Sequence, residues 1–270
     1  MRPLLVKNTF LSLDFRNRRT MKSTLTALFL TMCVSLTQGC KPGGSPITVL
    51  GTPRFVPQSQ PDSVLEAGVG QDPGNGRLFV QWYNTAGAAG YKLYRSDSTN
   101  TSQVPIDFSV IANQVSTPPF NDSSFVDVTA GVGTTYYYYL VAYSAEGGQS
   151  QPSDTINYRL LHRPGLISPA ANAQVNPSGL YFNWHDVTSG GFTVIRVKDI
   201  TNIPQVVIWV SRRFSAYDAY PSRIFNFDSL ATSNLIPGHI YEWRVDRFNV
   251  DGSGRPYQGA RSVWTTFTVN

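Results

Sequence analysis

The sequence predicts an all-β fold of two tandem antiparallel β-sandwiches, and three observations carry this prediction. Bulky apolar residues occupy every second position in short runs such as residues 78–82 (LFVQW), the period of a half-buried strand. The same pattern returns 102 residues further on, at residues 180–184 (LYFNW). The 270-residue chain also holds 22 Gly and 18 Pro and is 13% aromatic, a composition typical of turn-dense sandwiches.

The N-terminal segment has the layout of a bacterial export signal. Lys22 supplies a positive start, residues 25–36 form an apolar run shorter than a membrane span, and the run is followed by Gly39-Cys40. This ending resembles the lipobox of bacterial lipoproteins. The resemblance implies that residues 1–39 are a signal peptide and that Cys40 is lipidated, so that its acyl chains attach the protein to a membrane.

Alternatives stay open at this end of the chain. Translation from Met21 is one of them, and an ordinary secretory signal or an N-terminal anchor, with Cys40 unmodified, is another. Thr37 departs from the Leu usual at its lipobox position. Lys41 stands where some bacteria use Asp to retain lipoproteins in the inner membrane, so the resemblance favours the outer membrane of the cell envelope.

The positive charge of the chain is confined to its N-terminal segment. Residues 1–40 hold six of the 22 Lys/Arg and one of the 17 Asp/Glu, so the remaining chain has 16 of each and is neutral. A neutral body offers no electrostatic basis for binding nucleic acid. Both cysteines, Cys33 and Cys40, lie in this segment, so residues 41–270 have neither a disulfide nor a thiolate.

Residues 40–52 are predicted to be the lipidated Cys and a Pro/Gly-rich tether, and residues 53–161 the first sandwich. Turn signals rich in Gly and Pro separate its predicted strands. These strands span residues 78–82, 90–95, 108–112, 124–128, 133–143 and 155–160.

This ordered series (LFVQW, GYKLYR, FVD, GTTYYYYLVAY, then GQSQPS) resembles a fibronectin type III domain. The start of residues 133–143 matches the tyrosine corner of that family, although Val132 replaces the usual Pro. The resemblance implies that the Tyr136 hydroxyl bonds to backbone upstream.

Residues 133–143 place tyrosines on both faces of one strand, because side chains alternate. The residues expected to point into the core near Trp82 are Tyr136, Tyr138, Leu140 and Ala142. Those expected to point outward are Tyr137, Tyr139, Val141 and Tyr143. With Tyr94 from the neighbouring strand, Tyr137, Tyr139 and Tyr143 are the candidate partner-binding residues. Cross-strand packing that only stabilises the sheet, or cover by another part of the chain, is the competing interpretation.

A second sandwich is predicted at residues 166–270, after a short hinge at residues 162–165. Its expected strands include residues 180–184, 192–197, 206–210 and 262–269. Tyr241 continues a fuller tyrosine-corner pattern than the first domain has, and the second copy resembles a type III or related immunoglobulin-like sandwich. Residues 211–234 form an insertion-like stretch that either carries binding or packs its own aromatics; its notable residues are Arg212, Arg213, Phe214, Tyr217 and Tyr220.

The sequence shows no pattern for catalysis, a cofactor or a metal. His162, His185 and His239 have no second His or Cys at ligand spacing, and the hydrolase, metalloprotease and phosphate-loop motifs are absent. We therefore expect a non-enzymatic, lipid-anchored envelope protein that acts as a protein-binding, scaffold or accessory module. The first alternative is a carbohydrate-binding adhesion or accessory protein that uses the outward tyrosines, and the second is an enzyme with a cryptic site.

Overall fold

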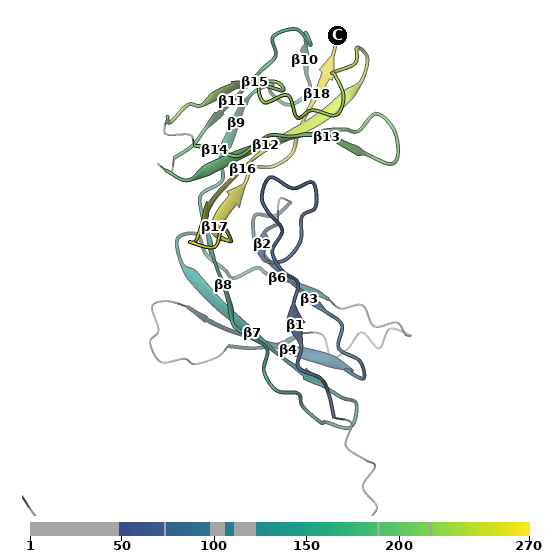
Figure 1. Ribbon diagram of the computed structural model, residues 1–270, viewed down its shortest axis with the longest axis vertical. Helices are drawn as coiled ribbons and strands as arrows, with labels where there is room; N and C mark the ends of the chain where they lie inside the picture. The colour runs from purple at the N-terminus through teal and green to yellow at the C-terminus, as the bar shows by residue number, and fades with distance from the viewer. Residues whose placement is uncertain (1–48, 73, 98–105, 111–122, 188–189, 216–217) are drawn as a thin grey trace, which may run out of the picture. The chain divides into compact units, whose positions relative to one another are not determined.

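The computed structural model describes residues 49–72, 74–97, 106–110, 123–187, 190–215 and 218–270, with 106–110 described by backbone alone. These residues form 18 strands and no helix, which confirms the all-β prediction (Figure 1). Among them there is accordingly no helix with the length and apolar character needed to cross a membrane. The predicted signal peptide, Cys40 and most of the tether lie outside the described residues.

The first sandwich is built from two antiparallel layers. In one layer, β3 pairs with β1, β2 and β6; in the other the strand order is β5-β4-β7-β8. The strands are β1 (Arg54–Phe55), β2 (Gly70–Gln71), β3 (Leu78–Tyr83), β4 (Gly90–Asp97), β5 (Ile106–Val110), β6 (Ser124–Asp127), β7 (Thr135–Tyr143) and β8 (Ile156–Leu160).

The core of this sandwich comes from the inward side chains that the alternation predicted. Trp82 on β3 is buried, and so are Tyr136, Tyr138, Leu140 and Ala142 on β7. Val141, which was expected to point outward, is also buried, although it does not belong to the core cluster. An outward position is therefore not always a solvent position, because neighbouring chain can cover it.

The second sandwich repeats the layered plan. One sheet has the order β15-β11-β9; in the other, β16 pairs with β12, β17 and β18, and β12 also pairs with β13 and β14. The strands are β9 (Gly165–Ser168), β10 (Ala173–Val175), β11 (Tyr181–His185), β12 (Phe192–Asp199), β13 (Val206–Val210), β14 (Phe214–Ser215), β15 (Ser222–Ile224), β16 (Ile240–Val250), β17 (Pro256–Arg261) and β18 (Thr265–Val269). Phe182, Trp184, Trp209 and Trp243 are at the centre of its core.

Each sandwich contains a tyrosine corner. The Tyr136 hydroxyl accepts a hydrogen bond from the Gly131 N–H at 2.9 Å, as predicted. In the second sandwich the Tyr241 hydroxyl accepts one from the Ile236 N–H, also at 2.9 Å. Each ring thus satisfies a loop N–H five residues upstream while the ring itself stays in the core.

The two sandwiches share one continuous sheet. β8 and β17 pair in parallel, with Gln258 opposite Arg159 and Gly259 opposite Leu160, and they lie side by side in Figure 1. The Leu161 N–H then donates to the Gly259 carbonyl at 2.9 Å. Residues 162–165, the predicted hinge, thus directly follow chain that is hydrogen-bonded to the second sandwich.

At four places a buried serine hydroxyl accepts a backbone N–H of the neighbouring strand, so that this buried donor stays paired where regular strand pairing stops. The Ser262 N–H donates to the Val245 carbonyl at 2.9 Å, while the Ser262 Oγ accepts from the Val245 N–H at 3.0 Å. The hydroxyl takes the place of a strand carbonyl, and it donates in turn to the carbonyl of the next residue. Ser150, Ser153 and Ser211 repeat this arrangement with Ala142, Leu140 and Ile195 respectively.

This serine arrangement explains an error in the predicted last strand. The sequence predicted one strand over residues 262–269, whereas the chain forms β17 up to Arg261 and β18 from Thr265. Both strands pair with β16, at different parts of its length. Ser262 marks the break, because its side chain rather than its carbonyl bonds to the neighbouring strand.

Candidate functional site

The first candidate site is the outward surface of β4 and β7, which we call the tyrosine face and define by Tyr94, Tyr137, Tyr139 and Tyr143. The antiparallel register places Tyr94 directly opposite Tyr139, and Tyr137 opposite Ser96. Alternation along β7 sends Tyr136 and Tyr138 into the core and leaves these rings outside. Secondary structure alone therefore brings Tyr94, Tyr137 and Tyr139 to one surface.

Tyr94 and Tyr139 form a stacked pair. Their ring centroids lie 4.5 Å apart and their planes differ by 7°. Both side chains are half-buried, whereas Tyr137 beside them is 40% exposed. Because the stack restricts both rings, they present a fixed aromatic surface whose ordering costs little entropy on binding.

Tyr143 has a structural role at the far end of this face. It lies opposite Gly90, and a Cβ atom on Gly90 would lie only 2.2 Å from the Tyr143 hydroxyl oxygen. The ring therefore lies across the glycine, in space that any other residue would fill. Packing against Gly90 within the sheet therefore accounts for the position of Tyr143.

A hollow of about 330 Å³ opens beside Tyr137 and Tyr139. Its other lining residues are Arg95, Ser96, Pro152, Ser153 and Thr155. Ser153 on the border of the hollow is held to β7 by its two hydrogen bonds with Leu140. The volume of the hollow is in the range of small-ligand pockets, and its lining combines aromatic rings with hydroxyl groups.

A buried charged network lies on the opposite side of the same strands. Arg95 Nη1 donates to Asp127 Oδ2 at 2.7 Å, and the Tyr138 hydroxyl donates to the same oxygen at 2.8 Å. Burial acts to raise the pKa of Asp127, but hydrogen bonds from Arg95, Thr129 and Tyr138 outweigh burial and lower that pKa. Burial is the largest cause that raises the pKa of Tyr138, and the negative charge of Asp127 raises it further. These groups satisfy one another inside the core, which is a structural role.

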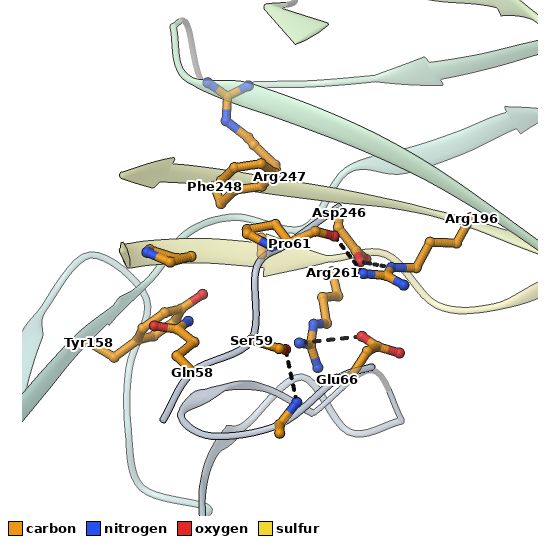
Figure 2. A pocket seen from close by; sticks show the side chains of 13 residues that line it. Gln58, Ser59, Pro61, Glu66, Tyr158, Arg196, Asp246, Arg247, Phe248 and Arg261 are labelled. Carbon is orange, nitrogen blue, oxygen red and sulfur yellow. Dashed lines mark hydrogen bonds and ion pairs between the residues drawn. The ribbon is translucent and has the colours of Figure 1, made fainter. Parts of the chain in front are cut away.

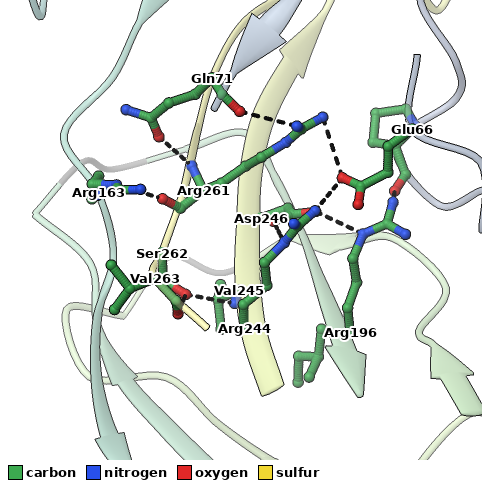
Figure 3. Close-up of polar contacts among 12 residues, drawn as sticks. Glu66, Gln71, Arg163, Arg196, Arg244, Val245, Asp246, Arg261, Ser262 and Val263 are labelled. Carbon is green, nitrogen blue, oxygen red and sulfur yellow. Dashed lines mark hydrogen bonds and ion pairs between the residues drawn. The ribbon is translucent and has the colours of Figure 1, made fainter. Parts of the chain in front are cut away.

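The second candidate region, at the junction of the sandwiches, was missed by the sequence interpretation. Arg196 on β12 and Arg244 on β16 lie opposite each other, and each donates through Nε to Asp246 at 2.7 Å (Figure 3). Arg244 also pairs with Glu66, which comes from the first sandwich. Burial favours a neutral Asp246, yet Arg244 and Arg196 outweigh burial and hold its pKa well below the ordinary value.

A sequence signal for this region did exist in residues 240–250. The inward residues of β16 follow the tyrosine-corner pattern, whereas the outward set of Glu242, Arg244 and Asp246 is fully charged with both signs. Such a row indicates ion pairing on the outer face of a sheet. The sequence alone does not indicate that residues some 180 positions earlier complete the cluster.

A small cavity of about 30 Å³ also lies at the junction (Figure 2). Its lining includes Gln58 and Ser59 from the first sandwich and Arg196, Asp246 and Phe248 from the second. Within the described protein the buried Gln58 Oε1 atom has no hydrogen-bond partner. The volume suits a single water molecule and excludes an organic ligand, so this cavity is part of the packing.

Within residues 211–234, the predicted insertion, several aromatic side chains pack against the second core or against one another. Phe214 and Phe227 contact each other edge to face at 5.4 Å, and Phe227 contacts Trp209 in the same way at 5.8 Å. Tyr220 is 70% exposed and stacks on His185, while Tyr217 lies outside the described residues. Phe214 and Phe227 therefore pack as the second interpretation expects, whereas Tyr220 lies at the surface.

Within the described ranges, no group of three or more His, Cys, Asp or Glu side chains is placed to hold a metal ion. His239 Nδ1 lies 2.7 Å from Asp199 Oδ2, and His185 stacks on Tyr220. Burial would raise the pKa of Asp199, but bonds from His239 and Thr201 outweigh it and lower that pKa.

Neither a protein-family model nor a curated protein matches this chain. Among solved structures, the chain is similar to an Fn3-like protein from Clostridium thermocellum, with 17% identity, a TM-score of 0.25, and coverage of 42% of this chain and 92% of that one. It is also similar to the chicken CNTN1 FN1-FN3 domains, with 13% identity, a TM-score of 0.26, and coverage of 82% and 67% respectively. Both likenesses concern the fold alone. By its own strands and sheets, the chain is an all-β protein of two tandem β-sandwiches.

Proposed function

We propose that this protein is a non-enzymatic, lipid-anchored cell-envelope protein that acts as a protein-binding, scaffold or accessory module. The observation that carries the binding role is the tyrosine face, where the stacked Tyr94–Tyr139 pair and the exposed Tyr137 stand beside an open hollow. The anchor rests on the lipobox-like sequence ending at Cys40, and the outer-membrane location rests on Lys41.

The proposed partner is another protein of the envelope. Tyrosine is enriched at protein interfaces because its ring buries a large area while its hydroxyl remains able to bond to a partner or to water. The β4–β7 ladder pairs eight consecutive positions, so the face is built on rigid elements. Because the side chains of such a face are already ordered, binding loses little of their conformational entropy.

The test is co-purification of partners with the full chain from detergent-solubilised membranes, followed by affinity measurement with the partner found. Tyr137→Ala and Tyr139→Ala should each weaken binding by about 30-fold if these rings are hot spots. Tyr181→Ala is the matched control, because Tyr181 is 52% exposed on β11 in the second sandwich. Equal loss of affinity in all three variants, or no loss in any, would reject the tyrosine face as the binding surface.

A neutral glycan is the second candidate ligand, and the hollow is the observation that favours it. An aromatic wall from Tyr137 and Tyr139 with hydroxyls from Ser96 and Thr155 offers stacking and hydrogen bonds to a sugar ring. The full chain should then bind defined glycans on an array, and the Tyr137→Ala/Tyr139→Ala double variant should not. An array on which the unchanged protein binds nothing would eliminate this alternative.

The anchor has its own test, independent of any partner. Mass spectrometry of the protein isolated from membranes should find an acylated Cys40 as the first residue of the mature chain. An unmodified Cys40, or a terminus that is not cleaved before it, would refute lipidation. Density-gradient separation of inner and outer membranes should place the acylated protein in the outer-membrane fraction.

A further inference from the structure

The segment of residues 57–68, which we call the junction loop, leaves and rejoins the first sandwich at nearly the same point. The Ser59 N–H donates to the Ala67 carbonyl at 3.2 Å, and the Ala67 N–H donates to Ser59 Oγ at 3.0 Å. At Gly68 the φ angle is +87°, and a Cβ atom there would lie 2.6 Å from the Gln58 Cα. The loop is thus closed at its neck, as in a compact Ω-loop.

Acceptors on the junction loop meet guanidinium donors on the second sandwich. Glu66 pairs with Arg244 and lies 3.3 Å from Arg261, as Figure 3 shows. The Pro61 carbonyl accepts from Arg196 Nη2 at 2.5 Å. At the edge of the contact, Asp62 lies 3.3 Å from Arg213. In these four contacts the loop supplies the acceptors and the second sandwich the donors, so they are electrostatically complementary.

The second sandwich cannot balance this charge from its own side chains at the junction. Arg196 and Arg244 share one carboxylate there, that of Asp246, and the Arg244 side chain is 1% exposed. The Arg244 guanidinium lies over the Trp264 ring, with its Cζ atom 4.6 Å from the ring centroid. The ring further separates the guanidinium from water. A buried guanidinium without its full set of partners costs several kcal/mol. Glu66 is therefore the group that completes the cluster.

The remaining links between the sandwiches lie close to the connection between them. The β8–β17 ladder has two residue pairs. Arg261 donates through Nη1 to the Gln71 carbonyl at 3.0 Å, and Arg163 Nε donates to the Arg261 carbonyl at 2.8 Å. These links hold the chain segments near the connection, whereas the junction loop reaches the face of β12 and β16 away from it.

We propose that the junction loop is an electrostatic latch that couples the two sandwiches into one body, with the Glu66 carboxylate as its decisive group. With Glu66 engaged, the sandwiches unfold and fluctuate together. When Glu66 is neutralised, the loop detaches from Arg244 and the coupling between the sandwiches weakens while each stays folded. This role does not depend on what the tyrosine face binds.

The test compares the full chain with Glu66→Gln, which keeps the shape of the side chain and removes its charge. Hydrogen exchange followed by mass spectrometry should show that residues 57–68 and 256–261 exchange at least about tenfold faster in Glu66→Gln than in the unchanged chain. The exchange rates of β7 and β11 should be the same in both proteins. Asp62→Asn is the matched control on the same loop; because its partner Arg213 is 37% exposed whereas Arg244 is 1% exposed, it should change these rates by about twofold or less. Calorimetry should show one unfolding transition for the unchanged chain and two for Glu66→Gln.

Salt provides a second measurement that does not require a variant. The Glu66 side chain is 29% exposed, so high salt should speed exchange of the junction loop in the unchanged chain and have little effect in Glu66→Gln. Three results would overturn the latch: unchanged loop exchange in Glu66→Gln, an equal increase throughout both sandwiches, or the same salt response in both proteins.

Discussion

Replacing Ser262 by Ala tests whether the buried serines act as substitutes for a strand carbonyl. Ser262 is fully buried, and its Oγ accepts the N–H of Val245, which is fully buried as well. The alanine variant leaves this N–H without an acceptor and creates only a small void. A buried unsatisfied N–H costs about 1–3 kcal/mol, so the free energy of unfolding should fall by that amount.

The assay is urea and thermal denaturation followed by tryptophan fluorescence. If the sandwiches unfold as one body, each kcal/mol lowers Tm by about 2–4 °C, so a drop of roughly 2–12 °C is expected. Ser253→Ala is the control, because Ser253 lies exposed at a hairpin tip and bonds to Asp251. A Ser262→Ala loss below about 0.5 kcal/mol, equal to that of the control, would refute the reasoning.

Three further changes test other parts of the fold. Tyr241→Phe removes the acceptor of the Ile236 N–H, so the free energy of unfolding measured by denaturation should fall by about 0.5–1.5 kcal/mol. No change would show that the second tyrosine corner does not stabilise the fold. Gly90→Ala places a Cβ against the Tyr143 ring and should increase nitration of Tyr143, measured by mass spectrometry; an unchanged rate would show that the ring does not depend on the glycine. The lowered pKa of Asp127 gives stability that is present above the unfolded pKa of about 3.9 and lost as pH falls through the folded value. Asp127→Asn should therefore flatten the acid limb of a stability-versus-pH curve, and an unaltered limb would contradict the assignment.

Local patterns predicted much of the fold because strand alternation is a local property. The inward and outward sets on β7 follow from the period of two, and Tyr136 follows from the corner pattern. The predicted strand at residues 206–210 matches β13 at both ends. The last strand departed from prediction, since the break at Ser262 depends on its contact with another strand.

The candidate site was predictable only in part for the same reason. The sequence placed Tyr94 and Tyr139 on one face, but their stacking and the hollow beside Tyr137 depend on register and on the path of residues 150–155. The junction was not foreseen because Glu66 and Arg244 are 178 positions apart. No local pattern encodes a contact over that distance.

The sequence by itself determined the fold class, the repeat of two sandwiches, the tyrosine corners and the outward row of tyrosines. These follow from side-chain period, turn chemistry and composition, which act within a few residues. The tertiary structure decided that Tyr143 rests on Gly90, that β8 and β17 join the sheets, and that Glu66 completes an arginine cluster. Such features arise when distant segments meet, because burial and charge balance depend on every group that surrounds a side chain.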